Sequence, residues 1–118
     1  MKTTYAEIEP FVTKDQSTIR ELLHPARHGV SAVSFAEATV EIGDTTAMHL
    51  HRKSEEIYHI TEGIGTMRLG TDEFEIRRGD TIFIAPGAPH NVSNTGRDAL
   101  KILCVSCPAY ADDDTSLM

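Results

Sequence analysis

The segment GDTTAMHLHRKSEEIYHITEG, residues 43–63, decides the fold predicted for this chain. Its second half, EIYHITEG (56–63), is rich in β-branched and aromatic residues and ends at a glycine, which is typical of a strand closed by a turn. In its first half, His49 and His51 have the two-residue spacing that places side chains on one face of a strand. The segment therefore predicts two strands separated by a short turn (52–55).

The chain on either side of this segment continues the strand pattern. Further β-rich stretches are HGVSAVSFAEATVEIG (28–43), TMRL (66–69), EFEIRRGD (73–80), TIFIAPGAPH (81–90) and LKILCVSC (100–107). Short strands with frequent turn signals predict an all-β, antiparallel sandwich or barrel with few or no helices. The one helix candidate is DQSTIRELL (15–23).

These patterns divide the chain into three parts. We expect residues 1–27 to form an N-terminal extension, as an edge strand or a short helix available for a dimer contact. Residues 28–110 form the β-barrel. Residues 111–118 form an acidic tail that is either frayed or pinned on the surface.

Composition excludes several classes of function. The chain has 118 residues, which fits one domain, and its formal net charge is −7. So acidic a protein is poorly suited to binding nucleic acid. The sequence contains no run of 18 apolar residues, so it predicts no membrane helix, and its N-terminus lacks the pattern of a secretory signal. We therefore expect a cytoplasmic protein with no nucleic-acid or membrane partner.

The only two cysteines, Cys104 and Cys107, have the C-x-x-C spacing of some zinc and redox sites. They lie in a predicted strand, however, where residues three apart point to opposite faces. A redox pair of this spacing sits instead at the start of a helix. We interpret both as small apolar strand residues with free thiols, in agreement with a reducing compartment.

A metal site is indicated by three histidines and one glutamate. His49 and His51 share a strand face with their Cα atoms about 6.6 Å apart, so both imidazoles can approach one ion. Glu56 follows the next turn and His90 follows the loop APGAPH (85–90). Three imidazoles and a carboxylate suit one divalent first-row metal, namely Mn, Fe, Ni, Co or Zn. Each piece alone also fits an ordinary surface residue.

Two stretches together resemble the two signatures of the cupin superfamily. The first reads Gly43-x5-His49-x-His51-x4-Glu56-x6-Gly63, and the second reads Gly79-x5-Ala85-x-Gly87-x2-His90-x3-Asn94. The family usually has proline where this chain has Ala85, a difference in the loop that leaves the ligand positions intact. The resemblance implies a small β-barrel, or jelly roll, with a metal inside one mouth held by His49, His51, Glu56 and His90. It also implies a homodimer.

Residues near these ligands suggest further roles. Strand alternation places Tyr58 on the face of Glu56, where it is a candidate general acid or base, or else a core tyrosine. His59 points outward. His24 and His28, with Arg27, either rim the pocket and attract an anionic substrate or lie in a solvated loop.

Two functions follow from this sequence. The first is a metal-dependent enzyme acting on a small oxygen-rich metabolite, of dioxygenase, sugar isomerase or epimerase, or lyase type. The alternative is a non-catalytic module that binds or senses a small molecule through the same metal site. The fold does not choose between them. The apolar residues of 100–107 on both strand faces favour a homodimer.

Overall fold

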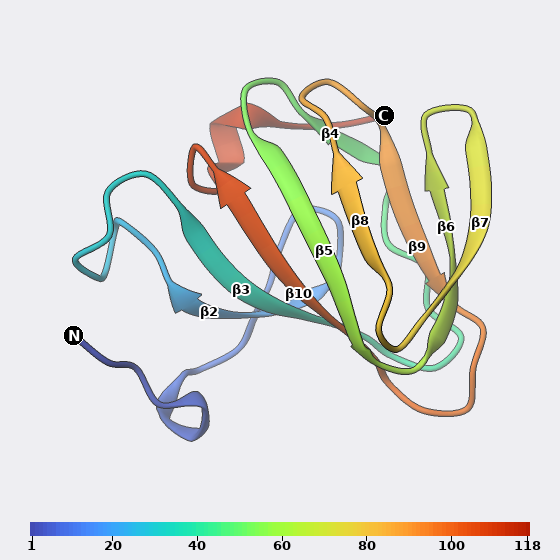
Figure 1. The fold of residues 1–118 in the computed structure, drawn as a ribbon, viewed down its shortest axis with the longest axis horizontal. Coiled ribbons are helices and arrows are strands. Elements are labelled where there is room, and N and C mark those ends of the chain that lie inside the picture. The colour runs from blue at the N-terminus through green and yellow to red at the C-terminus, as the bar shows by residue number, and fades with distance from the viewer.

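Two antiparallel β-sheets pack face to face in the computed structural model, which describes residues 1–118 (Figure 1). The larger sheet has the order β1-β2-β3-β10-β5-β8 and comprises β1 (Phe11–Val12), β2 (Thr18–Leu23), β3 (Ser34–Val40), β10 (Leu100–Cys107), β5 (Glu55–Glu62) and β8 (Thr81–Ile84). The smaller sheet has the order β11-β4-β9-β6-β7 and comprises β11 (Thr115–Leu117), β4 (His49–His51), β9 (His90–Asn94), β6 (Ile64–Leu69) and β7 (Asp72–Arg77).

The helical content is confined to two 3₁₀ turns, η1 (Tyr5–Glu7) and η2 (Asp112–Asp114). Neither helical segment has the length and apolar character needed to cross a membrane. The all-β, jelly-roll-like fold predicted from the sequence is therefore confirmed.

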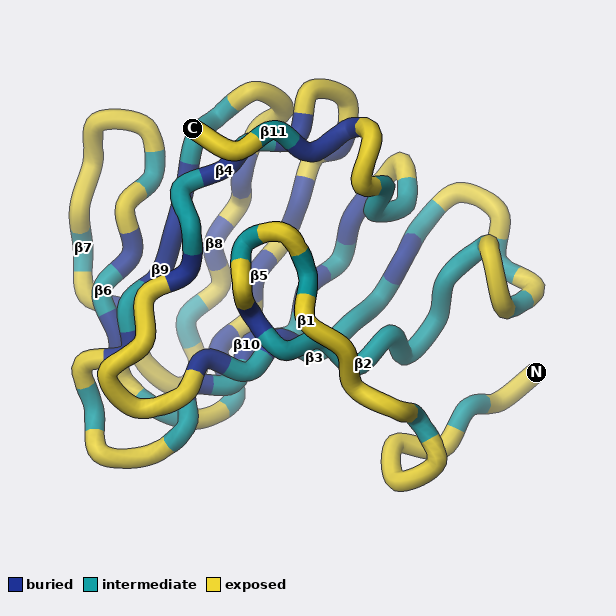
Figure 2. Tube along the Cα trace, turned by 180° about the vertical axis from the view of Figure 1, so that it is seen from behind, coloured by how far each residue is buried: buried dark blue, intermediate teal, exposed yellow.

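The core lies between the two sheets, because each central strand buries alternate side chains (Figure 2). In β5, Tyr58 and Ile60 point inward while Ile57 and His59 are exposed. The buried apolar cluster comprises Ala38, Val40, Tyr58, Ile60, Met67, Ile76, Ile82, Ile84, Val92, Leu100, Ile102 and Cys104. Close packing of β6 on β9 needs Gly65, since a Cβ there would lie 2.5 Å from the Ser93 carbonyl oxygen.

The helix predicted over residues 15–23 is wrong. Residues 18–23 form β2, which pairs with β3 so that Ile19 lies opposite Ala38. A turn precedes it, with Gln16 in the left-handed region at φ 73°. The segment contains Thr18 and Ile19, which fit a strand well, and the edge of β3 offers backbone partners, so tertiary pairing overrides weak helix propensity. Residues 1–27 contain the 3₁₀ turn η1 as well as the strands β1 and β2.

The acidic tail is pinned rather than frayed. Its last strand, β11, pairs with β4, with Thr115 opposite His51 and Leu117 opposite His49 (Figure 2). The Asp114 carboxylate accepts hydrogen bonds from the backbone N–H groups of Lys53 and Ser54 at 2.9 and 3.1 Å. The tail thus becomes the edge strand that covers the two predicted ligands of β4.

The outer face of the larger sheet carries an apolar row. Strand register places Phe35, Val105, Ile57 and Phe83 side by side across β3, β10, β5 and β8. Ile57 is 43 % exposed and Phe83 is 57 % exposed. In β10, Cys104 is buried and Cys107 exposed, as expected for strand residues on opposite faces, and both thiols are free.

Candidate metal centre

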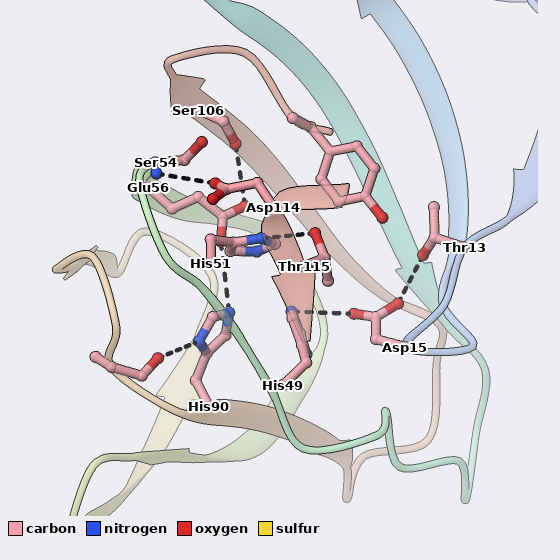
Figure 3. Close-up of polar contacts among 12 residues, drawn as sticks. Thr13, Asp15, His49, His51, Ser54, Glu56, His90, Ser106, Asp114 and Thr115 are labelled. Atoms are coloured by element: carbon pink, nitrogen blue, oxygen red, sulfur yellow. Dashed lines mark hydrogen bonds and ion pairs between the residues drawn. The ribbon is translucent and has the colours of Figure 1, made fainter. Parts of the chain in front are cut away.

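Three buried histidines converge between the two sheets (Figure 3). His49 and His51 point inward from β4, and His90 at the start of β9 lies opposite His49 in the strand register. One ring nitrogen of each lies within 4.8 Å of the others, close enough for all three to hold one metal ion. The structure therefore brings together the three histidines predicted from the sequence.

The outer ring nitrogen of each histidine is fixed by a hydrogen bond. His49 Nδ1 lies 2.9 Å from the Ala47 carbonyl oxygen and His90 Nδ1 lies 2.9 Å from that of Ala88. A carbonyl only accepts, so each Nδ1 carries the proton. The His51 Nδ1 partner is the Thr115 hydroxyl at 3.0 Å.

In its contact with His51 the Thr115 hydroxyl is the acceptor, because its own proton is donated to the Ala111 carbonyl oxygen at 2.9 Å. All three neutral imidazoles therefore carry their proton on Nδ1 and leave a lone pair on Nε2. This is the tautomer that a metal-binding histidine adopts when its far nitrogen is held by a protein acceptor.

Glu56, the first inward residue of β5, lies against this group. Its Oε1 is 3.0 Å from His51 Nε2 and 3.4 Å from His90 Nε2, and its Oε2 accepts a hydrogen bond from Ser106 at 3.2 Å. Glu56 Oε1 and His90 Nε2 are both buried without a hydrogen-bond partner. Lone pairs facing a carboxylate oxygen in a buried site need a proton or a cation between them, and a divalent metal fits this donor set.

The charges of the site are strongly coupled. Burial opposes the ionisation of Glu56, but the adjacent His51 and His90 rings outweigh this effect and lower its pKa to about 2. Burial likewise opposes protonation of His51, yet the adjacent Glu56 carboxylate raises the pKa of His51 above its usual value. His49 differs, because burial and the neighbouring His90 lower its pKa. Glu56 is therefore a carboxylate at any ordinary pH, ready to bind a cation.

A second carboxylate, Asp15, faces the same site and was missed by the sequence analysis. Its Oδ2 lies 3.7 Å from His49 Nε2 (Figure 3). Its Oδ1 accepts hydrogen bonds from the Thr13 hydroxyl at 2.7 Å and from the backbone N–H and hydroxyl of Ser17 at 3.0 and 2.7 Å. The sequence pattern that could have identified Asp15 is D-Q-S (15–17), which is typical of an Asx-type turn, but a helix was predicted over these residues instead.

The family model for the cupin domain matches residues 36–106, which contain all three clustered histidines. The chain belongs to the cupin family. It is 49 % identical over 118 residues to an uncharacterized protein of Methanocaldococcus jannaschii, an alignment that covers 100 % of this chain and 94 % of the relative.

Several solved structures are similar to this cupin in fold. A predicted oxalate decarboxylase of Thermotoga maritima has a TM-score of 0.80 at 26 % identity, covering 92 % of this chain and 99 % of its own. The nucleoside dehydratase Pac13 of Streptomyces has a TM-score of 0.81 at 17 % identity, covering 100 % and 90 %. The polyketide cyclase RemF of Streptomyces resistomycificus has a TM-score of 0.79 at 19 % identity, covering 97 % and 88 %. The similarities to Pac13 and RemF, at these low identities, show a shared fold alone.

The pocket of this cupin extends from the histidines along the inner face of the larger sheet. Tyr58 lines it, two residues from Glu56 on the same strand face, as strand alternation predicted. Its ring is 5.8 Å from that of His90, centroid to centroid. Burial, followed by the charge of Glu56, raises the pKa of Tyr58 well above its usual value. The protonated phenol is thus the form that this surrounding favours.

The histidines upstream of the barrel do not reach the pocket of this cupin. His24 donates from Nε2 to the Tyr110 carbonyl oxygen at 2.8 Å, and His28 Nδ1 accepts from the backbone N–H of His24 at 2.9 Å. Neither residue lines the pocket, nor does Arg27, so of the two alternatives given for this segment the structure favours the loop. Both rings accept backbone N–H groups of the turn that follows β2, His24 from Ala26 and His28 from His24, and His24 is also tied to the C-terminal segment through Tyr110.

The second sequence signature also has the structural role expected of it. Gly87 has φ 80° in the loop before His90, a conformation that suits glycine. Asn94 donates from Nδ2 to the carbonyl oxygens of Val40 and Asp98 at 2.9 and 2.8 Å, and its Oδ1 accepts from the Gly96 N–H at 2.9 Å. The side chain therefore holds the loop after β9 in place.

His59 lies on the outer face of β5, as strand alternation predicted. Its side chain is exposed, and its Nδ1 lies 2.8 Å from the Thr81 hydroxyl oxygen.

Proposed function

We propose that this cupin is a metal-dependent enzyme acting on a small molecule bound in the pocket beside the histidines. His49, His51, His90 and Glu56 would hold one divalent first-row metal. The observation that carries the proposal is the buried pair Glu56 Oε1 and His90 Nε2, which face each other at 3.4 Å without a hydrogen-bond partner. Two buried acceptors are costly unless a proton or cation joins them.

The donor set also supports a catalytic rather than a purely structural site. Three imidazoles and one carboxylate leave one or two positions free on a five- or six-coordinate ion, and free positions are characteristic of catalytic sites. When bound, the metal supplies a Lewis acid that stabilises negative charge on a coordinated oxygen. The pocket beside it is lined by Tyr58 and Val92 among other residues.

The protein's own groups then have distinct tasks. Tyr58 is proposed as the general acid or base, because its side chain lines the pocket from the same strand face as Glu56. Thr115, Ala47 and Ala88 hold the three imidazole rings in orientation. Similarity to a predicted oxalate decarboxylase, and the shared fold with a dehydratase and a cyclase, support an enzyme but leave dioxygenase, isomerase, epimerase and lyase types open.

The test is elemental analysis of protein purified without a metal-affinity tag, compared with two variants. We expect near-stoichiometric first-row metal in the unmodified protein and in His59→Ala, whose histidine is exposed, and none in His51→Ala. Iron, manganese or nickel would direct assays toward dioxygen chemistry, and zinc toward isomerase and lyase assays.

Two outcomes would contradict parts of the proposal. Protein that carries no metal and takes none up would remove the metal site. Protein that binds metal and a small molecule, but releases the molecule unchanged under every condition of metal and oxygen, would instead be the binding or sensor module.

A further inference from the structure

The pocket is lined by acidic side chains and by no lysine or arginine. Of its 21 lining residues, three are carboxylates, namely Asp15, Glu21 and Glu56, and none is a lysine or an arginine. An anionic ligand placed there would have no lysine or arginine to pair with and would be repelled by the like charge of these carboxylates.

Two basic side chains near the pocket are engaged elsewhere. Lys14 directs its ammonium to the carbonyl oxygens of Asp112 and Thr115 at 2.6 and 3.1 Å. Arg27 is 63 % exposed in its side chain and lies 3.8 Å from Glu21, so it offsets that carboxylate from outside. Among basic side chains, Asp15 and Glu56 contact only the clustered histidines and no lysine or arginine, and together they carry the charge that one divalent cation neutralises. The remaining pocket favours a ligand that adds no negative charge.

Asp15 is also positioned to contact such a ligand. Its Oδ1 is occupied by three hydrogen bonds from Thr13 and Ser17, which fix the carboxylate in place. Its Oδ2 accepts none of these bonds and faces the pocket 3.7 Å from His49 Nε2. A fixed carboxylate oxygen beside the metal-binding histidines accepts hydrogen bonds from hydroxyl or amino groups.

The opposite wall of the pocket is apolar. Ile19, Ala36, Ala38 and Ile102 line it from three neighbouring strands of the larger sheet. The two alanines leave space that larger side chains would fill, and the isoleucines provide contact surface. A ligand that fits both walls therefore has a polar end toward Asp15 and the histidines and an apolar body.

We infer that the pocket selects an uncharged or cationic ligand bearing a hydroxyl or amino group and an apolar body, and that Asp15 accepts a hydrogen bond from that group. The inference rests on the proposed function, because it names the substrate class of the same site. Small dianions such as oxalate, and sugar phosphates, are outside this class.

The experiment uses three probes of one shape and different charge: benzylamine, which is cationic at pH 7.5, neutral benzyl alcohol, and anionic benzoate. Each is titrated into metal-free and zinc-loaded protein while NMR follows the methyl groups of Ala38 and Val92, which line the pocket. We expect saturable shifts for benzylamine and benzyl alcohol in both forms, with benzoate at least about tenfold weaker.

Asp15→Asn is the decisive variant, because asparagine keeps the Oδ1 acceptor for Thr13 and Ser17 and replaces only Oδ2. We expect it to weaken benzylamine binding about tenfold and to remove the discrimination against benzoate, with zinc content unchanged. Asp113→Asn, which changes an exposed carboxylate that is absent from the pocket, is the matched control.

Several results would overturn the inference. They are benzoate binding as tightly as benzylamine, no saturable shift with any probe, or an unchanged order of affinities in Asp15→Asn. Loss of zinc from Asp15→Asn would show Asp15 to be a metal ligand instead. Failure of the unmodified protein to take up zinc would contradict the proposed function, while the order of affinities in metal-free protein would still decide the inference.

Discussion

His51 Nδ1 lies 3.0 Å from the hydroxyl oxygen of Thr115, a residue 64 positions later in the chain. Because that hydroxyl donates its own proton to Ala111, it is an acceptor for the imidazole N–H. One of the three clustered histidines is therefore oriented by the C-terminal strand, and the tail is part of the site.

Replacing Thr115 with valine removes this acceptor while keeping the shape of the side chain. We expect the variant to bind divalent metal about 10- to 100-fold more weakly, the range typical of lost partners of metal-binding histidines. Competition titration with a chromophoric chelator measures the affinity. Ser116→Ala, in the same strand but bonded to Arg52 instead, should bind metal as the unmodified protein does; equal loss in both variants would contradict the role of Thr115.

Metal affinity should fall in mild acid. All three imidazoles must be neutral to bind, and the raised pKa of His51 makes protons compete at a pH above its usual value of 6.5. The lowered pKa of His49 acts in the opposite direction, so His51 determines the pH at which the loss of metal affinity begins. We expect at least about a tenfold loss between pH 7.5 and pH 5.5 in chelator competition. A flat profile would contradict binding by three histidines.

Metal-free protein should lose stability in stronger acid through Glu56. Its pKa is lowered from 4.5 to about 2 on folding, so the folded state binds fewer protons than the unfolded state in this range. The stabilisation is complete above about pH 4.5 and is lost as pH falls toward 2, on the order of 3 kcal/mol. Denaturant unfolding in EDTA checks this against Glu56→Gln, whose free energy of unfolding should fall less steeply over the same interval.

Asp114 should contribute measurably to stability. Its carboxylate accepts the backbone N–H groups of Lys53 and Ser54, which belong to the turn between β4 and β5. We expect Asp114→Asn to lower the free energy of unfolding by about 1–3 kcal/mol, because hydrogen bonds to charged groups are worth this much. Asp113→Asn, next to it but exposed, is the control. Thermal melts that do not differ between the two variants would contradict this assignment.

The homodimer predicted from the sequence can be tested by measuring the mass of the protein in solution. The apolar row that includes Ile57 and Phe83 is exposed on the outer face of the larger sheet. We expect light scattering at micromolar concentration to give the mass of two chains. We also expect Phe83→Glu to reduce it to one chain with unchanged metal content, because burying an unpaired charge is costly. A monomeric unmodified protein would contradict the prediction.

The sequence by itself determined the central strands and the pair His49 and His51, because these depend on local spacing, whereas His90 was assigned through the resemblance to the second cupin signature. Alternation in 56–63 places Tyr58 beside Glu56 on one face, and the H-x-H spacing places His49 and His51 on another. These relationships extend over a few residues and need no knowledge of distant segments. The helix predicted at 15–23 failed because its propensity was weak and the partner strand is distant in sequence.

Only the tertiary structure decided which distant residues complete the site. Thr115 reaches His51 because β11 pairs with β4, and Asp15 faces His49 because the turn before β2 folds toward the pocket. Neither contact follows from a local period, since each joins segments more than 30 residues apart through sheet pairing and burial. Strand faces are set by a repeat of two residues, whereas neighbours across a barrel are set by the free energy of packing the whole chain.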